Sequence, residues 1–195
     1  MIILMGLAGS GKSTQGRILA ERLGGVWLSA GQVLRETQDA AMREVMDRGE
    51  LVDDGLVIQL MDKRMAEAEA AGKPVILDGY PRTVRQAEWV AVRPEVSGGT
   101  GASGTAGVRA VIWLEVPKEE LIRRLQLRGR SDDRDAAAIE ERLKIVKENA
   151  DEVCHILAQK GVRILAVDGL GTPEEVTERV WETVQKIRTG GQGED

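Results

Sequence analysis

The chain is poor in the residues that build metal sites and disulfides. Its 195 residues include one cysteine, Cys154, and one histidine, His155. A single cysteine cannot close an intrachain disulfide, and one cysteine with one histidine cannot complete a zinc site. Phenylalanine is absent and aromatic residues make up only 3% of the sequence, so we expect an aliphatic core. The cysteine usage fits a reducing compartment, and we expect a cytoplasmic protein.

Long apolar runs and an excess of positive charge are also missing. No stretch approaches the about 18 apolar residues that indicate a membrane span. The run at residues 2–5 is too short for the apolar part of a secretion signal and is followed directly by glycine. The formal net charge of −5 would repel a nucleic acid backbone. We therefore expect no membrane or nucleic acid partner, and no pattern recommends more than a monomer.

The sequence does contain short apolar runs that alternate with amphipathic stretches. Runs of strand length occupy residues 1–5, 74–77, 108–114 and 162–167. Between them, apolar residues recur at the helical spacings of three and four, namely at Val57, Leu60, Met61, Met65 and Ala68, at Ile139, Leu143, Val146, Val153 and Leu157, and at Val176, Val180, Val184 and Ile187. This alternation predicts one domain with a three-layer α/β/α fold around a central parallel sheet.

Other segments are identified by their turn and capping residues. Residues 97–107 are rich in glycine and serine, and with the tail at 189–195 they are expected to be flexible. Residues 99–104 match the dinucleotide pattern G-x-G-x-x-G, but no strand precedes them and no helix follows, so we interpret them as a loop. Thr172 is expected to cap the last helix, with Pro173 at its first position.

The strongest motif is a phosphate-binding loop. Residues 6–13 (GLAGSGKS) satisfy G-x-x-x-x-G-K-[ST] between an apolar run and a helical stretch at 14–23. Glycines allow backbone N–H groups to surround an anion, Lys12 adds a positive charge, and Ser13 can place its hydroxyl on Mg²⁺. The motif predicts ATP binding by Gly9, Ser10, Gly11, Lys12, Ser13 and Thr14.

Four further segments identify a resemblance to a known family. They are residues 28–35 (LSAGQVLR), 49–57 (GELVDDGLV), 77–83 (LDGYPRT) with Gln86, and 128–133 (RGRSDD) followed by Arg142 and Leu143. With the phosphate loop, their order and spacing resemble adenylate kinases of the short-lid form over nearly the whole chain. The resemblance implies a P-loop kinase fold with a helical excursion for the nucleoside monophosphate at about 29–58 and a short lid at about 128–134. It also implies reversible, magnesium-dependent phosphoryl transfer from ATP to AMP, giving two ADP.

The resemblance also implies roles for individual residues. The residues implied in catalysis are Lys12, Arg82, Arg124, Arg130 and Arg142. Besides the loop, ATP would contact Arg124, Arg128 and Gly171. AMP would contact Ala30, Arg35, Glu50, Leu51, Val52, Gly79, Tyr80, Pro81, Arg82, Gln86, Arg130 and Arg142. Magnesium would be held by Ser13 and Asp78, largely through water. Independently of the resemblance, the reaction requires several cations, because both nucleotides are polyanions.

Two sequence positions bear on which base the acceptor carries. Ala30 is usual at its position in UMP/CMP kinases, where most adenylate kinases have threonine. Thr83 and Gln86 follow the AMP pattern, and a glutamine amide can pair with adenine through one donor and one acceptor. We favour AMP, with CMP or UMP as the alternative acceptor. Less favoured alternatives are a P-loop kinase of a metabolite hydroxyl, with Asp78 as the base, and a non-catalytic nucleotide sensor.

Overall fold

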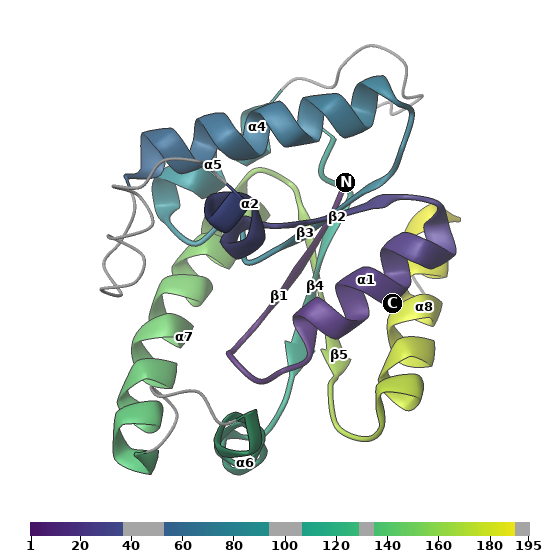
Figure 1. Cartoon of the computed structure of the whole chain (residues 1–195). Helices are drawn as coiled ribbons and strands as arrows, with labels where there is room; N and C mark the ends of the chain where they lie inside the picture. The colour runs from purple at the N-terminus through teal and green to yellow at the C-terminus, as the bar shows by residue number, and fades with distance from the viewer. Residues whose placement is uncertain (37–52, 94–106, 129–134, 190–195) are drawn as a thin grey trace.

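A parallel sheet lies at the centre of the molecule (Figure 1). The computed structural model describes residues 1–36, 53–93, 107–128 and 135–189. Within these ranges five strands pair in the order β2-β3-β1-β4-β5, and all of their pairings are parallel. The strands are β1 (Ile2–Gly6), β2 (Val26–Ser29), β3 (Val75–Asp78), β4 (Ala110–Glu115) and β5 (Arg163–Asp168).

Helices cover both faces of the sheet, which confirms the predicted three-layer α/β/α fold. In Figure 1 the purple α1 and the yellow α8 lie together on one side, and α4, α5 and the green α7 lie on the other. The helices on the first side are α1 (Lys12–Leu23) and α8 (Pro173–Arg188). Those on the second side are α4 (Asp54–Ala70), α5 (Val84–Val92) and α7 (Ala136–Gln159). Two shorter helices, α2 (Ala30–Glu36) and α6 (Lys118–Arg128), contact α4 and α7 respectively.

Two aliphatic cores fill the spaces between these layers, as the composition predicts. Alternate residues of β1 point to opposite faces, so Ile3 packs with the α4, α5 and α7 side and Leu4 packs with the α1 and α8 side. A third, smaller cluster joins α6 to the first turns of α7 and contains Leu121, Leu125, Ile139 and Leu143. The apolar stripes predicted for α4 and α8 face these cores, since Met65 and Val184 are fully buried.

One residue of the stripe predicted for α7 is exposed. Val146 keeps 39% of its surface in solvent, whereas Leu143 and Val153 are buried. Leu143 belongs to the α6 cluster, and Val153 belongs to the core against the sheet. Val146 therefore lies on the stretch of α7 between its two packing partners, which explains why the periodicity continues where the burial does not.

The predicted boundaries of the helices and strands agree with the structure to within about two residues, and one strand, β2, was missed. The strand β2 has four residues, mostly half-buried, and follows the helix-ending Gly24, which adopts the left-handed conformation. The predicted cap of α8 is confirmed: the Thr172 hydroxyl accepts the Glu175 N–H, and the Glu175 carboxylate accepts the Thr172 N–H in return.

Several predicted segments lie outside the described residues. These are residues 37–52 of the helical excursion, 97–106 of the glycine-rich loop, 129–134 of the lid and 190–195 of the tail. Among the helices that the structure does describe, none combines the length and the apolar character that crossing a bilayer would require.

The sheet topology has a switch point, the crevice, at the carboxyl ends of β1 and β3. The helix after β1, α1, covers one face of the sheet, and the helix after β3, α5, covers the other, although the two strands are neighbours. The chain thus leaves the carboxyl ends of β1 and β3 in opposite directions. Open parallel sheets bind their ligands at such a point, and Asp78 at the end of β3 pairs in register with Leu4 of β1.

Candidate active site

The phosphate-binding loop joins β1 to α1 across this crevice. Gly6 has a φ of +139°, and a Cβ at this position would lie 2.8 Å from both the Leu114 carbonyl oxygen and Ser10 Oγ. The Ser10 N–H donates to the Leu7 carbonyl at 3.1 Å, which closes the loop on itself. Gly11 caps α1 in the left-handed conformation with no side-chain cap, and the first turn holds no acidic residue. The helix N-terminus is therefore left free to bind an anion.

Lys12 bends back over this loop. Its Nζ donates to the Leu7 carbonyl oxygen at 2.8 Å and lies 3.5 Å from Ser10 Oγ. The pKa of Lys12 is lowered to about 8, first by burial and also by the nearby positive charges of Arg82 and Arg128, against the opposing effect of Asp78. Burial and the neighbouring positive charges therefore outweigh the effect of Asp78 on Lys12.

Asp78 and Ser13 meet at the base of the crevice. Ser13 Oγ donates to Asp78 Oδ2 at 2.6 Å, and Asp78 is only 3% exposed. A hydroxyl and a carboxylate from two neighbouring elements are hard oxygen ligands of the kind Mg²⁺ takes, usually with several of its waters retained. The two residues predicted to hold magnesium therefore lie together and fit that ion.

Arg82 and Arg35 add positive charge beside Asp78. Arg82 Nε donates to the Gly79 carbonyl at 2.8 Å, and a Cβ on Gly79 would lie 2.9 Å from Arg82 Nη2, so only glycine leaves room for this arrangement. The pKa of Arg82 is lowered by desolvation and by Arg35, against the effect of Asp78. Within the described chain, neither arginine forms an ion pair with a carboxylate.

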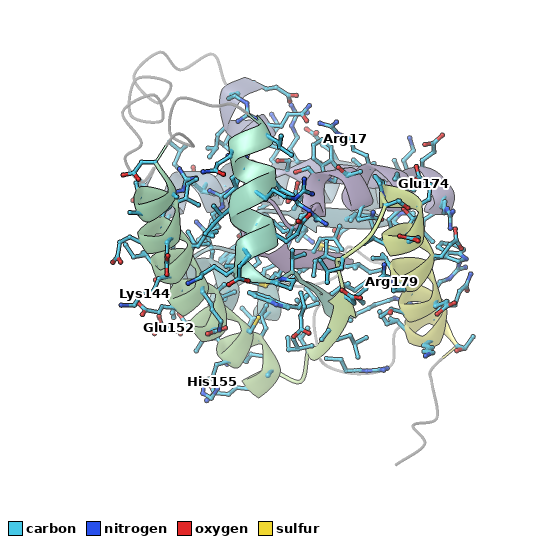
Figure 2. All side chains as sticks on the ribbon, turned by 90° about the horizontal axis from the view of Figure 1, so that it is seen from below. Arg17, Lys144, Glu152, His155, Glu174 and Arg179 are labelled. Carbon is cyan, nitrogen blue, oxygen red and sulfur yellow. The ribbon has the colours of Figure 1, made fainter. Side chains whose placement is uncertain are left out.

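Several other arginines of the described chain do have carboxylate partners. The ion pairs elsewhere in the described chain include Arg22–Glu178, Arg64–Glu36, Arg93–Glu69, Arg123–Glu120 and Arg179–Asp168. Figure 2 shows one such arginine, Arg179, on α8. The crevice therefore gathers cations around a single buried carboxylate, and this arrangement favours a bound polyanion.

Gln86 is held beside Arg82 by hydrogen bonds at both ends of its amide. Its Oε1 accepts the Arg82 backbone N–H at 2.8 Å, and its Nε2 donates to Asp54 Oδ1 at 2.6 Å. Thr83, which caps α5, donates its hydroxyl to Asp54 Oδ2 at 2.8 Å. The sequence predicted a role for Gln86 but not for Asp54, because an aspartate at the start of a helix is already explained by the helix dipole.

A hollow of about 330 Å³ lies on the α8 side of the phosphate-binding loop. Six residues predicted to bind ATP line it, namely Gly9, Ser10, Gly11, Thr14, Arg124 and Gly171. Arg124 Nε donates to Glu120 Oε1 at 2.6 Å, and its Nη2 donates to the Gly169 carbonyl at 3.1 Å. The sequence missed the other lining residues, which are Gln15, Glu120, Arg123, Gly169, Pro173 and Val176. They reach this hollow from α1, α6, α8 and the connection from β5 to α8, which only the fold brings together.

The remaining predicted site residues lie on α2, α6, α7 and the connection from β3 to α5, or outside the described residues. Ala30 is buried at the start of α2, and Tyr80 and Pro81 are buried in the connection from β3 to α5. Arg128 ends α6, and Arg142 lies on the part of α7 that packs against α6. The predicted residues Glu50, Leu51, Val52 and Arg130 lie outside the described residues. His155 is exposed near the end of α7, at the periphery of the molecule in Figure 2.

The P-loop opens into a crevice lined by cations, at the switch point of a parallel sheet. This arrangement is that of a P-loop nucleotide kinase fold. Comparison with known proteins gives the family. The model of the family described as adenylate kinase matches residues 4–162. The chain is 38% identical to an adenylate kinase of Thermus thermophilus, over 92% of this chain and 94% of that protein.

Two further relatives agree with this match. An adenylate kinase of Maricaulis maris is 38% identical over 90% of this chain and 93% of its own length, and one of Micrococcus luteus is 33% identical over 96% and 92%. The chain therefore belongs to the adenylate kinase family, and the resemblance inferred from its motifs is confirmed.

Proposed function

We propose that the chain transfers the γ-phosphoryl group of magnesium-bound ATP to AMP, reversibly, giving two ADP. The observation that carries this proposal is the set of cations around Asp78. Arg82 and Arg128 both lie close enough to Lys12 to lower its pKa, and Arg35 in turn lowers the pKa of Arg82. Repulsion between cations placed close together opposes folding, and two phosphate-bearing substrates bound among them would offset that cost.

ATP is proposed to span the hollow and the loop. Its base and sugar occupy the 330 Å³ hollow beside Arg124 and Gly171, and its phosphates extend along the loop to Lys12. Arg124 is held in place by Glu120, so its guanidinium is preorganised. Ser13 and, through water, Asp78 would hold Mg²⁺, which would neutralise part of the charge of the phosphates.

AMP is proposed to bind on the other side of Asp78. Arg35 and Arg82 hold its phosphate, and the base lies toward Gln86 and Ala30. The proposed contacts also include Gly79, Tyr80, Pro81, Arg142 and, from outside the described residues, Glu50, Leu51, Val52 and Arg130. A phosphate monoester has its second pKa near about 6, so the acceptor is already a nucleophile at neutral pH and needs no general base. Catalysis is then positioning together with charge neutralisation.

A matched pair of arginine variants tests this proposal. Arg82→Ala removes a site cation that has no carboxylate partner within the described chain, and Arg22→Ala removes a cation of α1 that is paired with Glu178 of α8. We expect Arg82→Ala to lower kcat/KM for AMP by about 10³-fold or more, measured by coupled detection of ADP. Arg22→Ala should stay within about twofold of the parent, because an exposed ion pair contributes about 0–1 kcal/mol.

The same assay run with a panel of acceptors decides the base. AMP, CMP, UMP and GMP are offered to the parent protein at equal concentration. A preference for CMP or UMP would contradict AMP as the acceptor. Equal loss of activity in both arginine variants, with both folded by circular dichroism, would contradict the role given to the unpaired arginines.

We also propose that the protein acts as a monomer. The described site residues Lys12, Asp78, Arg82 and Gln86 all come from one chain, so no second copy is needed to bring them together. Light scattering during size exclusion should give a mass near 21.2 kDa. A stable dimer at micromolar concentration would contradict this expectation.

A further inference from the structure

The amide of Gln86 is fixed between two groups of opposite hydrogen-bonding character. Asp54 offers a carboxylate oxygen, which can only accept, at 2.6 Å from Gln86 Nε2. The backbone N–H of Arg82, which can only donate, lies 2.8 Å from Gln86 Oε1. Turning the amide over would place nitrogen against the N–H and oxygen against the carboxylate. Gln86 is only 4% exposed, so water cannot compensate for such a mismatch.

This fixed orientation leaves one donor and one acceptor unused. An amide nitrogen has two N–H groups and an amide oxygen has two lone pairs, and one of each is already engaged. The remaining pair matches the edge of adenine, whose N1 accepts and whose amino group donates. Cytosine presents the same pattern, whereas guanine and uracil present a ring N–H donor beside a carbonyl acceptor. The orientation therefore selects between these two classes of base.

We propose that Asp54 is a positioning residue that sets base selectivity by fixing the orientation of Gln86. The inference rests on the proposed function, since it requires the acceptor base to meet Gln86. Helix capping does not account for Asp54, because Asp53 is the N-cap of α4 and accepts the Leu56 N–H at 3.0 Å. The two hydrogen bonds of Asp54 instead cross from α4 to Thr83 and Gln86.

The test compares neighbouring aspartates. Asp54→Ala removes both cross-helix hydrogen bonds. Asp53→Ala removes the same charge one residue away together with a helix cap, but it does not touch Gln86. We expect Asp54→Ala to raise KM for AMP about tenfold, leave KM for ATP unchanged and lower the AMP-to-GMP ratio of kcat/KM about tenfold. Asp53→Ala should lower the melting temperature and leave that ratio unchanged.

A double variant shows whether Asp54 acts through Gln86. In a Gln86→Ala background, the further change Asp54→Ala should no longer alter the AMP-to-GMP ratio. An unchanged ratio in the Asp54→Ala single variant, or equal rises in KM for AMP and ATP, would overturn the inference while leaving the proposed function intact. A parent protein that does not phosphorylate AMP would instead refute the proposed function, and the inference with it.

If Asp54→Ala does not fold, two substitutions that keep the size of the side chains at positions 86 and 54 provide the test. Gln86→Glu places two carboxylates against each other, and adding Asp54→Asn restores a hydrogen bond between positions 54 and 86 with its direction reversed. The double variant then offers the base only acceptors, which suit the N–H groups of guanine. Its AMP-to-GMP ratio should fall at least tenfold below that of the parent, and an unchanged ratio would refute the role of Asp54.

Discussion

Replacing Lys12 by methionine should abolish phosphoryl transfer and at the same time raise the stability of the protein. Methionine has nearly the same length and shape but no charge, so it removes the cation with little change in packing. Activity falls because the outer phosphates of ATP lose their point charge. Stability rises because the fold no longer has to hold an ammonium among other cations.

The size of the gain follows from the pKa of Lys12. An unperturbed lysine titrates near 10.5, and the folded protein lowers the pKa to about 8. At about 1.36 kcal/mol per pH unit, keeping Lys12 charged at pH 7 costs about 3 kcal/mol. Residual solvent contact reduces this cost, and the variant also loses a hydrogen bond to the Leu7 carbonyl that is worth about 1 kcal/mol. A net gain of about 1–2 kcal/mol should raise Tm by about 2–8 °C.

The gain should shrink as the pH rises. Below about pH 8 the folded protein holds Lys12 charged and bears the whole cost. Between about 8 and 10.5 the unfolded chain binds a proton that the folded chain has released, so the parent becomes more stable with rising pH. The advantage of Lys12→Met should therefore be largest at pH 7 and be reduced by about 2 kcal/mol at pH 9.5.

Differential scanning calorimetry at the two pH values, beside an ADP assay, checks both parts of this prediction. Lys160→Met serves as the control, because it makes the same chemical change at an exposed position at the end of α7. A parent protein at least as stable as Lys12→Met at pH 7 would refute the reasoning. So would a difference between the two proteins that stays constant with pH.

Two further predictions concern stability alone. Arg93 is 4% exposed and bonds Asp62 and Glu69 of α4, so Arg93→Ala should cost about 3 kcal/mol and lower Tm while leaving the specific activity of the folded protein unchanged. Loss of activity without loss of stability would contradict this structural role. A Cβ on Gly16 would lie 2.6 Å from Trp27 Cδ1, so Gly16→Ala should cost about 1–3 kcal/mol in urea unfolding. An unchanged unfolding midpoint would contradict the predicted clash.

Local patterns in the sequence were enough to predict the layers of the fold and the phosphate loop. Three of the four strands found from apolar runs, β1, β3 and β4, have buried residues on both faces of the sheet, for example Ile76 and Leu77 of β3, and such burial produces a continuous apolar signal. The fourth, β5, is an edge strand with only Val167 buried, and its apolar run was found from residues 162–167. The strand β2 lies at the edge of the sheet and is mostly half-buried, so its four residues carry no such signal. Its position could be found only from its pairing with β3.

The candidate-site residues also divide into those that a local pattern predicts and those that only the fold identifies. Lys12 and Ser13 belong to a contiguous motif whose geometry is local, so their roles could be inferred from spacing. Asp54 and Glu120 act by holding Gln86 and Arg124, and these partners are 32 and 4 residues away in the sequence. A carboxylate that orients another side chain has the same local pattern as a solvated charge on a helix, and only its partner identifies it.

The same argument explains why charge pairing is informative about function here. The sequence has 27 lysine and arginine residues, and composition gives no means of ranking them. The fold pairs Arg22, Arg64 and Arg93 with carboxylates, which ordinary packing on or near a surface explains. Within the described chain it leaves Arg35 and Arg82 without such partners, with Arg82 near Lys12 and Arg35 near Arg82. Cations that are close together yet have no ion pair in the described chain therefore indicate the phosphate site, and removing Lys12 should affect stability and activity in opposite directions.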